Sequence, residues 1–140
     1  MGKILCATRG GEASYHTQDA AIALARERGD ELVFLYVVDT SFLDKTAGGI
    51  VVDIEGGIGK MGEFLLAMAQ ERAAQQRVEA RAICREGRVR QVIKATAVEE
   101  GATLVVLGRP AGETSAFIPK ALRSFADEIE GETGIEVVIV

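Results

Sequence analysis

The amino-acid sequence predicts an α/β fold with an open, mostly parallel sheet and helices on both faces. Short apolar segments alternate with segments of helical periodicity, which is the pattern of repeated β-α units. Residues 31–38 and 103–107 are apolar on both faces, as expected of central strands in a parallel sheet. With 140 residues, the chain is expected to form a single domain spanning residues 1–140.

The expected strands differ in their patterning. They cover residues 3–8, 31–38, 78–84, 103–107 and 135–140. The third alternates, with Val78, Ala80, Ala82 and Cys84 on one face and Glu79 and Arg81 on the other, so we expect it at a sheet edge. The last strand, Ile135 to Val140, is apolar throughout and is expected at the opposite edge. Its exposed backbone would pair with a second copy in a two-fold homodimer, or a loop would cover it.

The expected helices are defined by apolar stripes and stop signals. They cover residues 13–28, 58–75 and 89–100, and a fourth begins near Pro119, which suits a first helical turn. Gly29 and Gly101 follow the first and third helices and can take the left-handed capping conformation. The predicted buried stripes are Ala13, Thr17, Ala20, Ala21 and Leu24; Ile58, Met61, Leu65 and Met68; Val89, Val92, Ile93, Thr96 and Ala97; and Leu122, Phe125, Ala126 and Ile129.

Composition excludes several classes of protein. The chain is 48% hydrophobic and 26% charged, which argues against disorder, and no apolar run approaches the roughly 18 residues of a membrane span. The net charge is -5 and the basic residues are dispersed, so we expect neither nucleic-acid nor membrane binding. The first residues enter an apolar strand too short for a signal sequence, which predicts a mature cytoplasmic protein.

No catalytic or metal-binding constellation is evident. His16 is the single histidine, expected on the surface of a helix, and no serine or cysteine stands at a nucleophile elbow. Cys6 and Cys84 have no partner at metal-ligand spacing and are expected to be buried, reduced thiols. We therefore predict no catalytic residues and no metal.

Ligands of open parallel sheets bind beyond the carboxyl ends of the strands. Those ends are residues 8–12, 38–41 and 108–115. The first and third combine glycines with an arginine, and the backbone N–H groups of such a loop can hold a phosphate ahead of a helix. Ordinary turn glycines are the alternative.

A second glycine motif, Gly57-Ile58-Gly59-Lys60-Met61-Gly62, matches the GxGxxG pattern of dinucleotide sites. That pattern requires an acidic residue closing the next strand, whereas Glu79 stands at its beginning. The stretch also fails as a P-loop, because Met61 stands where Ser or Thr would bind magnesium. A dinucleotide or flavin site here stays an alternative. We expect residues 39–57 to form a long connection over the strand ends, as a lid or a partner surface.

Two stretches carry a resemblance to a known family. Lys3-Ile4-Leu5-Cys6-Ala7-Thr8-Arg9-Gly10-Gly11-Glu12-Ala13-Ser14 and Gly101-Ala102-Thr103-Leu104-Val105-Val106-Leu107-Gly108-Arg109 resemble the first and fourth strands, with their loops, of universal stress proteins. The resemblance covers the whole chain. It implies a Rossmann-like sheet of order 3-2-1-4-5, dimerisation through strand five and, in many members, ATP between the first and fourth strand ends. This order separates the strands of Cys6 and Cys84 by roughly 9 to 10 Å, too far for a disulfide.

The strand ends and this resemblance together define a candidate nucleotide or anion site. Its residues are Ala7, Thr8, Arg9, Gly10, Val37, Val38, Gly108, Arg109, Gly112, Arg123 and Ser124. The family's opening loop has proline and aspartate where this chain has Ala7 and Arg9, and the substitution of arginine for aspartate reverses the local charge. The sequence therefore predicts an altered site.

The phosphate motif of the family, Gly-x-x-Gly, nine residues, then Gly followed by Ser or Thr, is also imperfect. Gly108 matches, Gly112 falls one residue late, and Arg123-Ser124 stand where Gly-Ser is expected. Pro110 removes one backbone donor.

Arg9, Arg109 and Arg123 would therefore either exclude ATP or bind another anion through bidentate contacts, unless they are solvated surface residues. A neighbouring acid such as Asp39 or Glu113 would be a plausible companion for them. We expect a homodimeric regulatory or stress-response protein, not an enzyme, that binds ATP or AMP weakly or not at all. The alternatives are a true ATP- or AMP-binding member with slow or no hydrolysis, and a dinucleotide- or flavin-binding domain.

Overall fold

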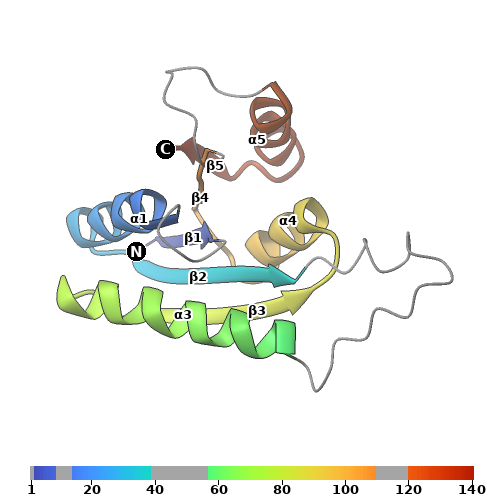
Figure 1. Cartoon of the computed structure of the whole chain (residues 1–140). Helices are drawn as coiled ribbons and strands as arrows, with labels where there is room; N and C mark the ends of the chain where they lie inside the picture. The colour runs from blue at the N-terminus through green and yellow to red at the C-terminus, as the bar shows by residue number, and fades with distance from the viewer. Residues whose placement is uncertain (1, 9–13, 39–56, 110–119) are drawn as a thin grey trace, which may run out of the picture.

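The computed structural model describes residues 2–8, 14–38, 57–109 and 120–140. Within these, five parallel strands form one sheet in the order β3-β2-β1-β4-β5 (Figure 1), which confirms the predicted fold class and strand order. The strands are β1 (Lys3–Ala7), β2 (Glu31–Val38), β3 (Ala80–Glu86), β4 (Leu104–Leu107) and β5 (Glu136–Ile139).

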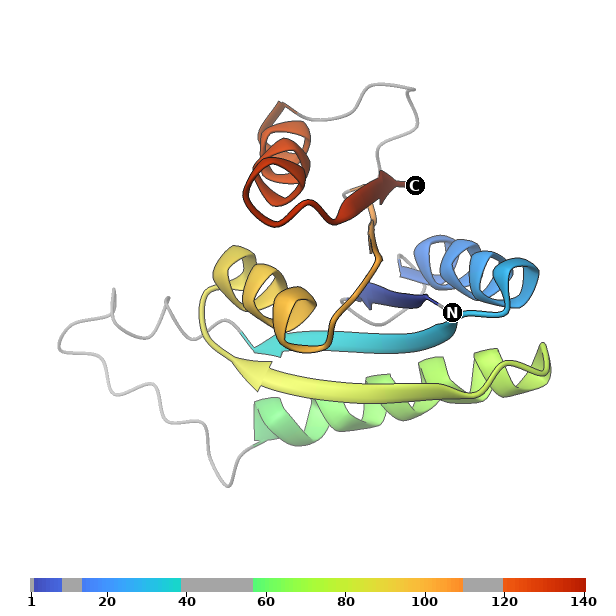
Figure 2. The same ribbon diagram turned by 180° about the vertical axis from the view of Figure 1, so that it is seen from behind.

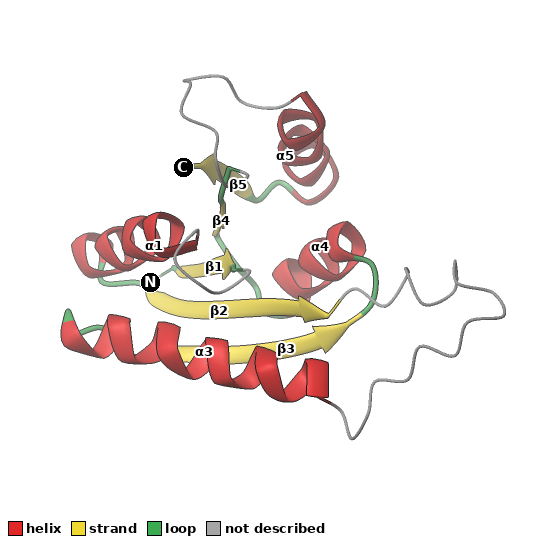
Figure 3. Ribbon diagram, in the orientation of Figure 1, coloured by secondary structure: helices red, strands yellow, loops and turns green. Residues whose placement is uncertain are grey.

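Helices cover both faces of this sheet (Figure 3). They are α1 (Tyr15–Arg28), α3 (Gly57–Gln75), α4 (Val89–Glu99) and α5 (Lys120–Thr133). Seen from the front and from behind, α1 and α3 lie on one side of the sheet and α4 and α5 on the other (Figures 1 and 2). None of the helices in the described ranges combines the length and apolar character that crossing a bilayer requires.

Two hydrophobic cores follow from the alternation of side chains along the strands. On one face, Cys6 and Phe34 pack with Ala21 of α1 and Leu66 of α3. On the other face, Leu5, Leu35 and Val105 pack with Ile93 of α4 and with Phe125 and Ile129 of α5. The apolar patterns of β1, β2 and β4 thus arise because these strands are covered on both sides.

The helix boundaries and caps agree with the sequence to within a few residues. Gly29 and Gly101 each have φ of 67°, the left-handed conformation predicted at these stops. Pro119 lies outside the described residues, directly before α5. In α4 and α5 the predicted stripes are buried or half-buried, except for Val89, which is 38% exposed at the start of α4.

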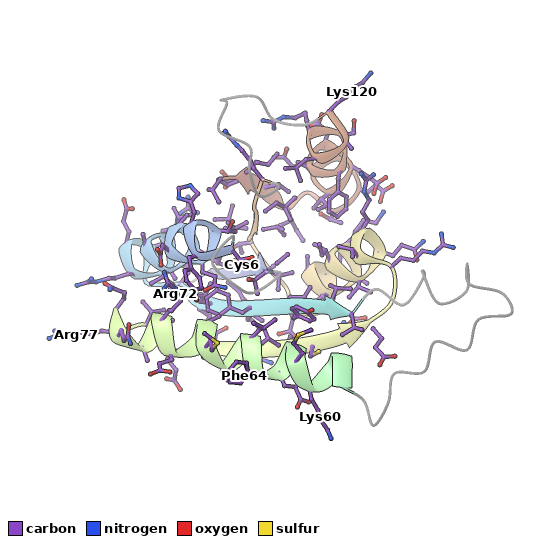
Figure 4. All side chains as sticks on the ribbon, viewed as in Figure 1. Cys6, Lys60, Phe64, Arg72, Arg77 and Lys120 are labelled. Atoms are coloured by element: carbon purple, nitrogen blue, oxygen red, sulfur yellow. The ribbon has the colours of Figure 1, made fainter. Side chains whose placement is uncertain are left out.

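The predicted buried face of α3 is wrong. Met61 and Met68 are 53% and 36% exposed, whereas Leu66, Ala69 and Ala73 are buried against the sheet. Phe64 is 65% exposed, and Figure 4 shows it with Lys60 on the outer side of the helix. The small residues face inward because Gly62 brings the helix close to β2: a Cβ on Gly62 would lie 2.6 Å from Cδ1 of Tyr36.

Two smaller corrections concern α1 and β3. In α1 the predicted Thr17 and Ala21 are buried and Ala20 and Leu24 are half-buried. The buried face also includes three residues that were not predicted, Gln18, Ile22 and Ala25. Ala13 lies outside the described residues. Strand β3 begins at Ala80 and not at Val78, because its pairing with β2 runs from Ala80 to Glu86. The predicted edge position of β3 is confirmed, and the thiols of Cys6 and Cys84 are free and separated by β2.

Candidate functional site

A cavity of about 530 Å³ lies at the carboxyl ends of β1, β2 and β4, on the face covered by α4 and α5. This is where an open parallel sheet is expected to bind a ligand. Its lining among the described residues is mainly apolar and comprises Ala7, Thr8, Leu35, Tyr36, Val37, Val89, Arg90, Ile93, Leu107, Gly108, Ala121, Leu122 and Phe125.

The end of β1 is held firmly at the cavity. The backbone N–H of Thr8 donates to the carbonyl oxygen of Leu35 at 2.9 Å, which continues the pairing of β1 with β2. Nε2 of Gln18 donates to Oγ1 of Thr8, also at 2.9 Å, and both side chains are buried, at 1% and 5% exposure. A buried hydrogen bond of this kind fixes the orientation of the Thr8 hydroxyl.

The end of β4 is shaped by a close approach to α1. A Cβ added at Gly108 would overlap Oγ1 of Thr17 and would lie 3.1 Å from its Cβ. Only glycine therefore fits beside the first turn of α1 without displacing a side chain. The next residue, Arg109, donates its backbone N–H to the carbonyl oxygen of Val140 at 3.1 Å, which ties this end of β4 to the chain end.

Arg90 of α4 carries the charge of the cavity wall. Its Cζ lies 5.5 Å from the ring centroid of Phe125, and its Nη2 lies 3.4 Å from the carbonyl oxygen of Ala121. Both partners belong to α5, so Arg90 spans the two helices that cover the cavity. Among the described lining residues it is the one with a full charge.

The site predicted from the sequence consists of residues near the ends of strands one, two and four and of the last helix, and therefore does not include Arg90. The carboxyl end of β3 leads, through Gly87 and Arg88, into the first turn of α4, which lies beside the same cavity. The signal was available: the stretch Arg88-Val89-Arg90 sets two arginines at a strand-to-helix connection on the ligand-binding edge of the sheet. The end of the third strand is therefore also part of the candidate site.

The structure brings together only part of the predicted set. Ala7, Thr8, Val37 and Gly108 line the cavity. Val38 is buried, and its carbonyl oxygen accepts the N–H of Gly87 at 3.0 Å.

The other predicted residues lie elsewhere. Arg109 is half-buried, whereas Arg123 and Ser124 are exposed on α5, and none of the three is among the described lining residues. Arg9, Gly10 and Gly112 lie outside the described residues. The predicted grouping of Arg9, Arg109 and Arg123 stays a prediction.

The GxGxxG stretch lies within α3, whose first residue is Gly57. Its last glycine, Gly62, has a packing role, because it allows α3 to approach Tyr36 and Cys84. The apolar residues before the motif and the expected lid, residues 39–56, are outside the described part of the chain.

A second, more polar groove of about 700 Å³ runs between α1 and α3. Within it, Nη2 of Arg72 lies 2.6 Å from Oδ1 of Asp19, and the guanidinium stacks on Tyr15 with Cζ 4.1 Å from the ring centroid. Arg72 is thus already engaged by an acid and an aromatic ring. The groove presents far less apolar surface than the cavity at the strand ends.

Comparison with known proteins identifies the family. The model of the universal stress protein family matches residues 1–140. Universal stress protein YxiE of Bacillus subtilis (strain 168) is 35% identical over 120 residues, which cover 77% of this chain and 78% of that protein. The chain belongs to the universal stress protein family.

Solved structures of universal stress proteins share this fold. A family member from Burkholderia pseudomallei is 25% identical, with a TM-score of 0.74 over 99% of this chain and 95% of that one. A universal stress protein in complex with cAMP is 18% identical, with a TM-score of 0.72 over 99% of this chain and 96% of that one. The strand order implied by the sequence resemblance is therefore that of the family.

Proposed function

We propose that this universal stress protein is a cytoplasmic, homodimeric, non-catalytic regulator that binds one small phosphorylated ligand in the strand-end cavity, and that it holds ATP only weakly. An adenine mononucleotide such as AMP is the proposed ligand. The observation that carries the proposal is the cavity itself: a mainly apolar cavity at the ends of β1, β2 and β4, whose wall among the described residues includes one arginine, Arg90.

The size and lining of the cavity suit a flat, largely apolar group. Ligand sites of about 300–1,000 Å³ with apolar walls and a few fixed polar groups are typical of small-molecule binding, and the cavity of about 530 Å³ falls in this range. Leu35, Val37 and Leu107 supply apolar surface, and the held hydroxyl of Thr8 lies at the end of β1. A universal stress protein of the same fold has been solved with cAMP, an adenine mononucleotide.

Weak binding of ATP is proposed because the sequence departs from the nucleotide-binding motifs of the family. A triphosphate bound with magnesium needs several backbone or cationic partners along its phosphates, as phosphate loops provide. The motif that resembles the family's phosphate loop is shifted at Gly112, lacks a donor at Pro110, and has Arg123 in place of glycine. Arg9 stands where the family has an aspartate that contacts the nucleotide, so this chain lacks that acceptor.

Titration calorimetry with AMP and with magnesium ATP tests this proposal. We expect AMP to bind at least as tightly as ATP. An affinity for ATP ten-fold above that for AMP would contradict it and would favour a true ATP-binding member. The variant Arg9→Asp restores a carboxylate where the family has aspartate. It should strengthen ATP binding if loss of that acceptor is the cause, and no change would rule that cause out.

The homodimer is proposed from the β5 edge of the sheet. Figure 2 shows β5 beyond β4, with no described strand on its outer side. Val137, Val138 and Ile139 are only half-buried, although all three are apolar. An edge with unpaired backbone groups beside apolar side chains favours pairing with a second copy across a two-fold axis.

A single backbone donor allows a sharp test of this dimer. The N–H of Val140 donates to Leu107 at 2.9 Å, so the neighbouring N–H of Ile139 points away from β4, because these groups alternate along a strand. Ile139→Pro removes that outward donor, whereas Ile139→Ala shortens the side chain and keeps it. Light scattering after gel filtration should show that the proline variant dissociates at concentrations where the alanine variant stays dimeric. Equal dissociation of both variants, or a monomeric wild type, would contradict pairing through β5.

A further inference from the structure

We propose that Arg90 determines the specificity of the cavity by selecting ligands that carry a phosphate group over their uncharged counterparts. The inference rests on the proposed function, since it assigns a role within the same site. It concerns a residue of α4 outside the loops that the sequence singled out. The ligand class it implies is a flat apolar group bearing one phosphate.

Arg90 has no carboxylate partner among the described residues. Nearby cations of β3 and α4 are all engaged: Arg81 with Glu100 at 2.9 Å, Arg85 with Glu99 at 2.5 Å, and Lys94 with Glu128 and Glu132 at 3.1 and 2.6 Å. Arg90 instead contacts the face of Phe125 and the carbonyl oxygen of Ala121. Its charge is therefore not neutralised by an acid in the described part of the chain.

The guanidinium of Arg90 lies between α4 and α5 and still has N–H donors to offer. An arginine has five N–H donors in a rigid fork, and one contact at 3.4 Å to Ala121 engages only one nitrogen. A cation–π contact with Phe125, with Cζ 5.5 Å from the ring centroid, places the group at the boundary between α4 and α5. The remaining donors can make the two parallel hydrogen bonds that bind a phosphate bidentately.

Arg90 differs in its chemistry from the cavity walls beside it. The neighbouring walls, Val89, Ile93 and Leu122, are aliphatic, so they give no hydrogen bonds to a ligand. An uncharged apolar ligand would be bound by these walls alone, whereas its phosphorylated counterpart would also form hydrogen bonds with Arg90. Arg90 should therefore give the phosphorylated ligand the higher affinity.

The test uses matched pairs of ligands with and without phosphate: AMP with adenosine, and 1-naphthyl phosphate with 1-naphthol. Arg90→Met keeps the apolar stem and removes the charge. We expect this variant to bind AMP and 1-naphthyl phosphate about 10-fold more weakly than the wild type does. Its affinities for adenosine and 1-naphthol should stay within about two-fold of the wild-type values. Arg90→Lys should retain part of the preference, because it keeps the charge without the fork.

Arg88→Met is the control, because Arg88 is exposed like Arg90 but, unlike Arg90, is not among the described lining residues of the cavity. It should leave all four affinities unchanged. Thermal unfolding of each variant verifies that the fold is intact.

The outcomes separate this inference from the proposed function. If binding of 1-naphthyl phosphate depends on Arg90 but AMP does not bind, the role of Arg90 is supported and the proposal of a nucleotide ligand is refuted. Equal losses for charged and uncharged ligands would show that Arg90 only shapes the cavity and would overturn the inference. Unchanged affinities in Arg90→Met, or a wild type that binds neither phosphorylated probe, would overturn it as well.

Discussion

Replacing Gly108 by alanine tests how closely β4 and α1 approach at the cavity. The added Cβ would overlap Oγ1 of Thr17 and lie 3.2 Å from its Cγ2, so a buried side chain must move. Overpacking of this kind costs about 1–3 kcal/mol. Alanine also restricts the unfolded chain, which returns about 0.4–1 kcal/mol at a position without positive φ. We expect a net loss of about 0.5–2 kcal/mol in the free energy of unfolding, measured by urea denaturation.

Two further variants make that prediction specific. Thr17→Ala removes the overlapping oxygen, so the double variant should be more stable than the sum of the single effects by at least 0.5 kcal/mol, roughly the lower bound for residues in contact. Gly131→Ala is the control, because a Cβ at this position of α5 meets nothing within 4 Å. That variant should be neutral or up to about 1 kcal/mol more stable. If Gly108→Ala is as stable as the wild type, or if the two positions do not couple, the close approach is refuted.

Three other predictions concern the core and the thiols. Gly62→Ala should lower stability although it favours the helix, because its Cβ would press on Tyr36; a rise like that expected for Gly131→Ala would contradict the packing of α3. Burial raises the pKa of the Cys6 thiol from 9.0 to about 12, so the folded state holds a proton that the unfolded state loses. Unfolding free energy should therefore fall between pH 9 and 12, by up to about 1.4 kcal/mol per pH unit, and the fall should be shallower in Cys6→Ala; parallel curves would exclude this cause. Native protein should react with a thiol reagent at Cys84 alone and slowly at pH 8, because partial burial together with Glu63 and Glu86 raises the pKa of this thiol; modification of Cys6 without unfolding would contradict the buried position of β1.

The sequence predicts the sheet well because the strands sit in unambiguous environments. The runs 32–35 and 104–107 are apolar on both faces, which only a strand covered on both sides requires. Glycine stops such as Gly29 and Gly101 also need no tertiary information, since the left-handed conformation is local. The strand order was predicted from the family resemblance, because the sequence of one strand does not specify which other strand pairs with it.

The face of α3 could not be predicted because two adjacent stripes compete. Met61, Leu65 and Met68 are spaced like Gly62, Leu66 and Ala69, one residue further along. Hydrophobicity alone favours the larger side chains. The sheet surface near Tyr36 and Cys84 accepts the smaller ones because they allow a closer approach, which is a property of the partner and not of the helix.

The sequence predicted several residues that line the cavity, but it did not predict the charged residue Arg90. Strand ends gave Thr8, Val37 and Gly108, since the topology of parallel sheets fixes where ligands bind. The predicted site left out Arg90, although the topology also places the end of β3 and the start of α4 at this edge of the sheet. The contacts of Arg90 with Phe125 and Ala121 could not be predicted, because they depend on how α4 packs against α5.

Chemical-shift mapping of AMP on the labelled protein tests the central claim most directly. We predict that the amide signals shifted on titration will cluster at Thr8, Val37, Gly108 and the first turn of α4 around Arg90. Shifts centred on Asp19 and Arg72 in the groove between α1 and α3, or no shifts at millimolar AMP, would contradict binding in the strand-end cavity.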